Sequence, residues 1–510
     1  GRATEALIQL ASSYGKLGRF HEATERASQA RFSAREAELR LLEARALIVL
    51  GELELAQSRY TQALKQYAAG MEVADPLGDP DLLWRLYFGE ARALDALGET
   101  EQAVGALQNA VLVIESVRSR LKEERFRAGY LEDKYAVYVE LVRLLLELGK
   151  VDEAFSASET LRSRSFQELL DRAYTPISLD AGQRREEAVL RARIRRLQKE
   201  LEKEQQPPAA DQRQAAVQTF SAELLAAERE YQELLDDVYA ETSDSGAVIN
   251  GAGIYTSTQV QKLLGPGRAL IEYVVAGDSI LAFVLTKDGI RATSVAVRGR
   301  DLQAKVELLR ELLLIKDNSS WRKPSQSLAD LLITPIEDEG WLQGIDQLYL
   351  APHGVLHYLP FAVLLRHISE QNRFLVQDYE IAYLPSAAVL GQKAAVDAPV
   401  SILALAPDSA ELEHTMEEAQ NVSEFFAEAG LVLTGADATE DSFKRLAPDY
   451  GVLHLATHGT FNKFNPLLSA IELEAGAGDD GQLQVQEILN LNIQADLVTL
   501  SACETALASG

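Results

Sequence analysis

The chain has 510 residues, of which 47% are hydrophobic and 25% charged, and these values are ordinary for a soluble globular protein of about three or four domains. Its formal net charge of −27 repels phosphate backbones, which excludes nucleic acid as an expected direct partner. We expect a cytoplasmic location and no membrane segment, because the sequence has neither an apolar run of about 18 residues nor a secretion signal at its start.

Residues 1–175 carry an irregular repeat. At four of its Leu-Gly pairs, an alanine stands five residues after the glycine. The glycines are Gly18, Gly51, Gly98 and Gly149, and the alanines are Ala23, Ala56, Ala103 and Ala154. Glycine in the left-handed conformation ends a helix, and a small alanine allows the following helix to cross it closely. The pattern therefore predicts an all-α array of stacked helical hairpins.

The turns resemble those of the tetratricopeptide repeat (TPR), as residues 18–23 (GRFHEA) and 149–154 (GKVDEA) illustrate. The first two glycines are 33 residues apart, close to the repeat length of about 34, whereas the next two spacings are 47 and 51. Longer or additional helices would account for the difference. Such arrays form curved solenoids with a concave binding surface. We expect an arm that binds a protein trigger or a protein substrate; a purely structural scaffold is the alternative.

Residues 176–242 contain two stretches of helical periodicity on either side of a double proline at 207–208. In each stretch, apolar residues recur every three or four positions, which is typical of a helical seam. The members are Leu190, Ile194, Leu197 and Leu201, then Val217, Phe220, Leu224, Ala227, Tyr231, Leu234 and Val238. Because proline breaks a helix, we predict an antiparallel helical hairpin that links the two ends of the chain.

Residues 243–395 change to the period of β-strands. Apolar runs at 269–275 and 279–285 are joined by a short polar turn, which predicts a hairpin. A third strand is expected at 290–297, and a helix near 299–316. This region is predicted to be a β-rich N-terminal part of the following domain.

Residues 396–510 alternate strands and helices. Strands are predicted at 400–406, 432–434, 452–457 and 495–501, and helices near 412–428, 439–446 and 485–490, where Thr439 or Asp441 caps the second helix. This alternation is typical of an α/β fold with a mainly parallel sheet, in which catalytic groups lie at the carboxyl ends of strands.

Two of these strand ends carry reactive side chains. One strand ends in His458-Gly459 and the next in Ala502-Cys503, and Cys503 is the only cysteine of the chain. A single cysteine excludes a disulfide within the chain and suits a reducing compartment. A nucleophilic thiol needs a base beside it, and imidazole is the side chain best matched to that task near neutral pH.

These residues resemble the caspase-like peptidases, in which a His-Gly pair ends one strand and an Ala-Cys pair ends the next. More narrowly, the chain is similar to the CHAT family, caspase-like domains found with TPRs, in the clan of caspases, separase and gingipain. The likeness rests on residues 351–361 (APHGVLHYLPF), 381–386 (IAYLPS), 454–459 (HLATHG) and 500–505 (LSACET).

The resemblance implies that Cys503 attacks a peptide carbonyl and that His458 delivers the proton to the leaving amine. It also implies an oxyanion hole formed by the backbone N–H groups of Gly459 and Cys503. The expected function is that of a regulated cysteine endopeptidase that cleaves a specific protein partner, in a bacterial defence or cell-death pathway. The alternative is a non-catalytic TPR adaptor with a vestigial caspase-like domain.

In caspase-like folds, the loop after the first parallel strand helps to line the pocket for the residue before the cut. Here that loop carries Asp408, Glu411 and Glu413, which would favour a basic side chain. An aspartate-directed pocket would need an arginine, which the loop lacks. The alternative is a solvated loop with acids at the start of a helix.

We expect no metal and no cofactor. His454 and His458 are four residues apart, which on a strand is about 13 Å and too far for a shared ion. His454 is therefore expected to be a packed residue, and His353 and His357 are expected to be structural. Members of the family continue past the cysteine with further strands, whereas this sequence stops at Gly510. A C-terminal small-subunit segment of the same gene product is thus an expected partner.

Overall fold

The computed structural model describes two units, formed by residues 1–166 with 252–391 and by residues 167–251 with 392–510. The described residues are 1–118, 134–173, 182–183, 185–186, 189–190, 192–194, 196–197, 200, 219–220, 223–224, 226–227, 230, 255–315, 318–368, 371–391, 401–408, 412, 414–426, 429–460, 468–476 and 478–503. Within these ranges, no helix is both long enough and apolar enough to cross a membrane.

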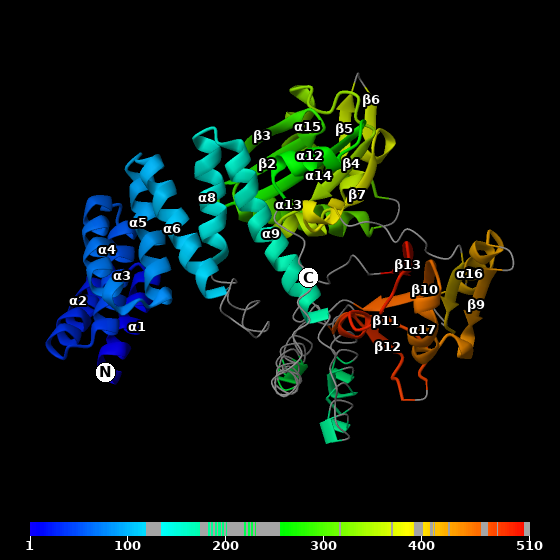
Figure 1. Ribbon diagram of the computed structural model, residues 1–510, viewed down its shortest axis with the longest axis horizontal. Coiled ribbons are helices and arrows are strands. Elements are labelled where there is room, and N and C mark those ends of the chain that lie inside the picture. Colours follow the sequence, from blue (N-terminus) through cyan, green and yellow to red (C-terminus); the bar gives the residue numbers. More distant parts are fainter. Residues whose placement is uncertain are drawn as a thin grey trace. The chain divides into compact units, whose positions relative to one another are not determined.

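The first unit begins with a helical repeat array, as predicted (Figure 1). Its helices form successive pairs along the chain, and the first helices of the pairs also contact one another, from α1 to α3 to α5. The helices are α1 (Arg2–Lys16), α2 (Phe20–Glu36), α3 (Arg40–Ala56), α4 (Tyr60–Ala74), α5 (Pro80–Ala96), α6 (Thr100–Arg118), α8 (Tyr135–Glu147) and α9 (Val151–Ala173).

The turns within the pairs correct one part of the predicted repeat. Gly18, Gly98 and Gly149 end their helices with φ of 73°, 79° and 72°, as expected. Gly51, however, lies inside α3, and the turn after α3 is formed by Ser58 with φ of 58°. Gly18, Ser58 and Gly98 are thus 40 residues apart in each step. The prediction of a turn at Gly51, 33 residues after Gly18, was wrong.

Small side chains allow the helix pairs to cross closely. Counted from the true turns, an alanine stands five residues later in each pair and is completely buried: Ala23, Ala63, Ala103 and Ala154. Gly51 has a similar role, because a Cβ at this position would lie 2.5 Å from the ring of Tyr67. Glycine after leucine therefore marked a close contact at Gly51 rather than a turn.

The β-rich part of the first unit is a five-stranded mixed sheet of order β3-β2-β1-β4-β7. β1 pairs antiparallel with β2, and parallel with β4. The strands are β1 (Arg268–Ala276), β2 (Ser279–Thr286), β3 (Gly289–Ala296), β4 (Gln347–Ala351) and β7 (Glu380–Tyr383), and a separate hairpin contains β5 (Leu365–Ile368) and β6 (Gln371–Phe374). The predicted hairpin, third strand and following helix are confirmed.

Helices cover both faces of this sheet. One face, with Ile271 and Tyr273, packs on α13 (Gly299–Leu313), α14 (Arg322–Leu332) and α15 (Thr334–Asp338). The other face, with Leu270 and Phe283, shares a core with the repeat helices α8 and α9 and with α12 (Ser257–Leu263). The repeat array and the β-rich part therefore form one packed body.

The second unit contains the predicted parallel sheet, in the order β9-β8-β10-β13. Its strands are β8 (Ile402–Ala406), β9 (Gly430–Thr434), β10 (Val452–Thr460) and β13 (Leu497–Cys503). The carboxyl end of β10 also pairs antiparallel with β11 (Ala470–Glu472), which in turn pairs with β12 (Gln482–Gln484). The remaining helices are α16 (Thr415–Glu424), α17 (Glu440–Leu446), capped by Thr439, and α18 (Val485–Ile488).

Most of the predicted helical hairpin at 176–242 lies outside the described residues. Five residues of this segment form one apolar cluster with Leu468: Leu190, Ile194, Leu197, Leu224 and Ala227. An ion pair of 2.8 Å joins Arg193 to Glu230 across the two stretches. The apolar seam is therefore real at these positions, and the direction of the two helices stays a prediction.

Candidate active site

His458 and Cys503 are register partners on neighbouring strands. β10 and β13 run parallel, and their pairing extends from Val452 opposite Leu497 to His458 opposite Cys503. Neighbouring strands are about 4.8 Å apart. Two residues that are 45 positions apart in the sequence thus reach adjacent positions at the carboxyl edge of one sheet. The apolar, strand-forming run before each of them produces this placement.

The alternation along β10 assigns His458 to one face of the sheet. Leu453 and Leu455 belong to the core beneath α17, whereas Ala456 packs beside Ala419 of α16. His458 shares the parity of Ala456, so it lies on the α16 face, where it is half-buried.

His454 lies on the same face, four residues before His458 along β10. It is buried, and its Nε2 lies 3.0 Å from Glu418 Oε1 on α16. The expectation that His454 is a packed residue is thus confirmed. The contact between His454 and Glu418 links α16 to β10, the strand that carries His458.

Gly459 follows His458 within β10 and is buried opposite Ile471 of β11. The backbone N–H groups of Gly459 and Cys503 stay the predicted oxyanion donors. They belong to adjacent strands at the same edge of the sheet, which is where two such donors would have to meet.

The predicted acidic loop is described at Asp408 but not at Glu411 or Glu413. Asp408 is exposed just beyond the carboxyl end of β8, and its backbone N–H donates to Glu474 Oε1 at 3.2 Å. Glu474 lies 66 residues further along the chain. No spacing in the sequence linked it to Asp408, because only the return of β11 toward β8 brings the two together.

The part of the chain that contains this geometry matches a known family. Residues 322–509 match the family model of the CHAT domain. The chain carries a CHAT domain. No curated protein matches the chain.

Solved structures resemble the chain at low TM-scores. Apo RapI aligns at 13% identity over 46% of this chain and 65% of its own, with a TM-score of 0.27. A kinesin light chain of Podosopora anserina with nearly identical TPR-like repeats aligns at 18% identity over 47% of this chain and 97% of its own (TM-score 0.27). The Saccharomyces cerevisiae separase–securin complex aligns at 9% identity over 95% of this chain and 49% of the other (TM-score 0.29). The chain spans less than two thirds of RapI and about half of the matched chain in the separase complex.

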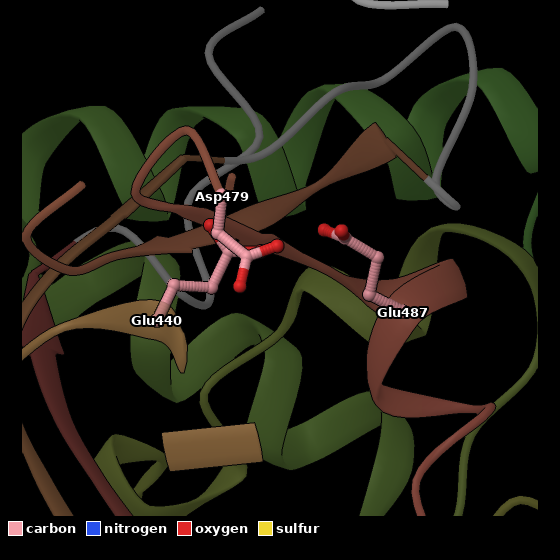
Figure 2. Close-up of side chains that lie close together, drawn as sticks. All are labelled: Glu440, Asp479 and Glu487. Atoms are coloured by element: carbon pink, nitrogen blue, oxygen red, sulfur yellow. The ribbon is translucent and has the colours of Figure 1, made fainter. Parts of the chain in front are cut away.

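Three carboxylates of the CHAT domain converge between α17, the turn after β11 and α18: Glu440, Asp479 and Glu487 (Figure 2). The ammonium of Lys444 lies among them, with Nζ at 2.7, 3.0 and 3.1 Å from the three groups. Burial and the neighbouring Glu487 raise the pKa of Glu440 to about 7. Lys444 occupies the place that a cation would take, so we interpret the cluster as an ion-pair hub.

The first motif segment of the CHAT domain, residues 351–361, contains a histidine with a structural role. His353 Nδ1 accepts the backbone N–H of Val275 at 3.1 Å, and its ring lies 6.2 Å from that of Tyr135 on α8. Burial lowers the pKa of His353 to about 4, which keeps the ring neutral as an acceptor must be. The structural interpretation of His353 is confirmed.

Buried polar groups join both early motif segments to the last repeat helix. From α9, Arg162 donates to the carbonyl of Pro352 at 2.7 Å, and Glu159 accepts from Ser386 Oγ at 2.9 Å. Arg162 also pairs with Glu272 of β1. The segments 351–361 and 381–386 thus hold α9 in place through hydrogen bonds, a role that the sequence did not reveal.

Proposed function

We propose that the protein is a cysteine endopeptidase in which Cys503 is the nucleophile and His458 its base. The observation that carries this proposal is the register of β10 and β13, which makes the two residues neighbours at a strand end. The CHAT domain supports it, since that family belongs to the caspase-like clan. His458 takes the thiol proton as Cys503 attacks the peptide carbonyl, and then gives it to the leaving amine. The N–H groups of Gly459 and Cys503 hold the oxyanion.

The helical array supplies the regulatory part of this proposal. It binds a protein trigger or the protein substrate, as helical repeats commonly do through their concave surface. In response to the trigger, the peptidase cleaves one protein partner. This limited cleavage would serve a bacterial defence or cell-death pathway.

A partner segment for β13 also belongs to the proposal. Leu497, Val498 and Leu500 of this strand are 55%, 47% and 45% exposed. Consecutive positions point to opposite faces, so both faces of the strand carry exposed apolar groups. Among the strands that the structure describes, only β10 pairs with β13. A small-subunit segment of the same gene product would cover this edge.

We further propose that Asp408 and its neighbour Glu474 favour a basic side chain before the scissile bond, together with Glu411 and Glu413. The contact between Asp408 and Glu474 places two acidic residues beside the carboxyl end of β8. A basic residue would be attracted to such a loop by charge.

The test is the rate of iodoacetamide alkylation, followed by intact mass between pH 5 and 9. Because the chain has one cysteine, the signal reports Cys503 alone, and Cys503→Ser provides the blank. Fast labelling below pH 7.5 that slows in His458→Ala would support the peptidase. Labelling that appears only after denaturation, even with a C-terminal segment and a binding partner added, would favour the non-catalytic adaptor.

A further inference from the structure

Glu472 lies on the opposite side of His458 from Cys503. β11 pairs antiparallel with β10 through Gly459 opposite Ile471 and Thr460 opposite Ala470. One step further along this register, Glu472 comes opposite His458. Cys503 already occupies the β13 side of His458, so Glu472 takes the other side. Antiparallel partners have Cα atoms about 4.5–5.5 Å apart.

Two contacts support this placement. The hydroxyl of Thr457, the residue before His458, donates to the carbonyl of Glu472 at 2.5 Å. Two residues beyond Glu472, the carboxylate of Glu474 accepts the N–H of Asp408 at the end of β8. β11 therefore lies on the same side of β10 as β8, and Glu472 is the residue of β11 that lies beside His458.

The pattern of burial assigns Glu472 to the face of His458. Its neighbours Ile471 and Leu473 belong to the core beneath α17. Because side chains alternate along a strand, Glu472 lies on the opposite face, which is the α16 face that also carries His458. Glu472 is half-buried there.

The carboxylate of Glu472 is available, whereas the acids around it are not. Glu440, Asp479 and Glu487, the three acids drawn in Figure 2, share Lys444. Glu418 contacts His454, and Glu474 accepts from Asp408. Within the described part of the chain, no hydrogen bond or ion pair engages the Glu472 side chain. An acid at this position, without another partner, is well placed to receive an imidazole N–H.

We propose that Glu472 is a positioning residue that accepts a hydrogen bond from the imidazole of His458, so that Cys503, His458 and Glu472 form one row across three strands. This inference rests on the proposed function. The thiol proton moves from Sγ to the near ring nitrogen of His458, and the far ring nitrogen keeps its proton and donates it to Glu472. The carboxylate thereby fixes the tautomer and stabilises the imidazolium that forms, without itself taking a proton.

Two readouts test the role of Glu472. The first is the pH profile of iodoacetamide labelling of Cys503 in the full chain. The second is the chemical shift of the His458 ring N–H by NMR of selectively labelled histidine, in which the signal is assigned by its absence in His458→Ala. Because a hydrogen bond to a charged acceptor is shorter and about twice as strong as one to a neutral acceptor, Glu472→Gln should move the ring N–H signal upfield and slow labelling below pH 7 roughly tenfold.

Two further variants control for charge and for folding. Glu418→Gln removes the same charge from the same face, beside His454, and should leave both readouts unchanged. Glu472→Asp keeps the charge on a shorter side chain and should give an intermediate shift, which tests the proposal even where Glu472→Gln fails to fold.

The outcomes separate this inference from the proposed function. An unchanged His458 ring N–H signal in Glu472→Gln, or an equal change in Glu418→Gln, overturns the role of Glu472 whatever Cys503 does. A Cys503 that stays unreactive in the wild-type chain counts against the peptidase. In that case the NMR signal still decides whether Glu472 accepts a hydrogen bond from His458.

Discussion

Arg162 of α9 and Glu272 of β1 form an ion pair of 3.2 Å, in which the side chains are 6% and 0% exposed. The same guanidinium donates to the carbonyl of Pro352, and Ser158 donates to Glu272. Charges removed from water are stable only when they are paired and hydrogen-bonded. This junction therefore fixes the last repeat helix against the sheet in one arrangement.

Arg162→Ala should destabilise the first unit by about 3–5 kcal/mol, because it leaves Glu272 charged and buried without its partner. Urea unfolding followed by circular dichroism measures the change. The matched control is Arg143→Ala on α8, whose ion pairs with Asp95, Glu140 and Glu147 are partly exposed. It should cost about 1 kcal/mol or less. Equal losses in the two variants would contradict the importance of burial at Arg162.

Glu159, in the same junction, makes stability depend on pH. Burial, and then the neighbouring Glu272, raise the pKa of Glu159 well above its ordinary value. The folded state therefore holds a proton that the unfolded chain releases, and stability falls as pH rises toward the folded-state pKa. Glu159→Gln keeps a neutral group beside Ser386 and Ala387. It should unfold like the wild type at pH 5 but resist urea better at pH 8. A variant with the same pH slope as the wild type would remove Glu159 as the cause.

The strands of the β-rich part and of the parallel sheet could be read from the sequence because they depend on local pattern. The runs that became β1, β2, β8 and β10 are apolar and strand-length, and the structure confirms them. Gly51 shows where local pattern stops being sufficient. A glycine after leucine indicates a helix end or a close contact equally well, and only the approach of Tyr67 from α4 decides between them.

Gly51→Ala should destabilise the array by about 1–3 kcal/mol, since the added Cβ would overlap the buried ring of Tyr67. Gly105 of α6 provides the control, because a Cβ there would meet nothing within 4 Å. Gly105→Ala should stabilise by about 0.5–1 kcal/mol through helix propensity alone. Thermal melting of both variants gives the comparison. If Gly51→Ala also stabilised, the close contact at Tyr67 would be refuted.

Ser58 and Gly98 occupy equivalent turns with φ of 58° and 79°. A residue with a Cβ is strained in this left-handed region by about 1–2 kcal/mol. Ser58→Gly should therefore stabilise the array by about 0.5–1 kcal/mol after the entropy of glycine is subtracted, and Gly98→Ser should destabilise it by about 1 kcal/mol. Opposite shifts in the urea midpoint are the expected result. Shifts of the same sign would show that the two turns are not equivalent.

The pair of His458 and Cys503 could be predicted because both residues end strands of one parallel sheet. Glu472 and Glu474 could not, since they reach this edge through an antiparallel return after the 461–467 segment. Lys444 was also missed. In the sequence, Lys444 looks like an ordinary exposed residue of a helix. In the structure, the turn after β11 and α18 bring Asp479 and Glu487 against it.

Lys444→Met should destabilise the second unit far more at pH 8 than at pH 5. Without the ammonium, Glu440, Asp479 and Glu487 repel one another, and Glu440 is buried. The pKa of Glu440 is already raised to about 7, so below this value the carboxyl takes a proton and the repulsion weakens. The sign follows from linkage: a raised folded-state pKa gives stability that is present at low pH and lost as pH rises through that value. Urea unfolding of wild type and variant from pH 5 to 8 measures the difference, which should grow with pH. A constant difference would mean that Lys444 contributes packing rather than charge.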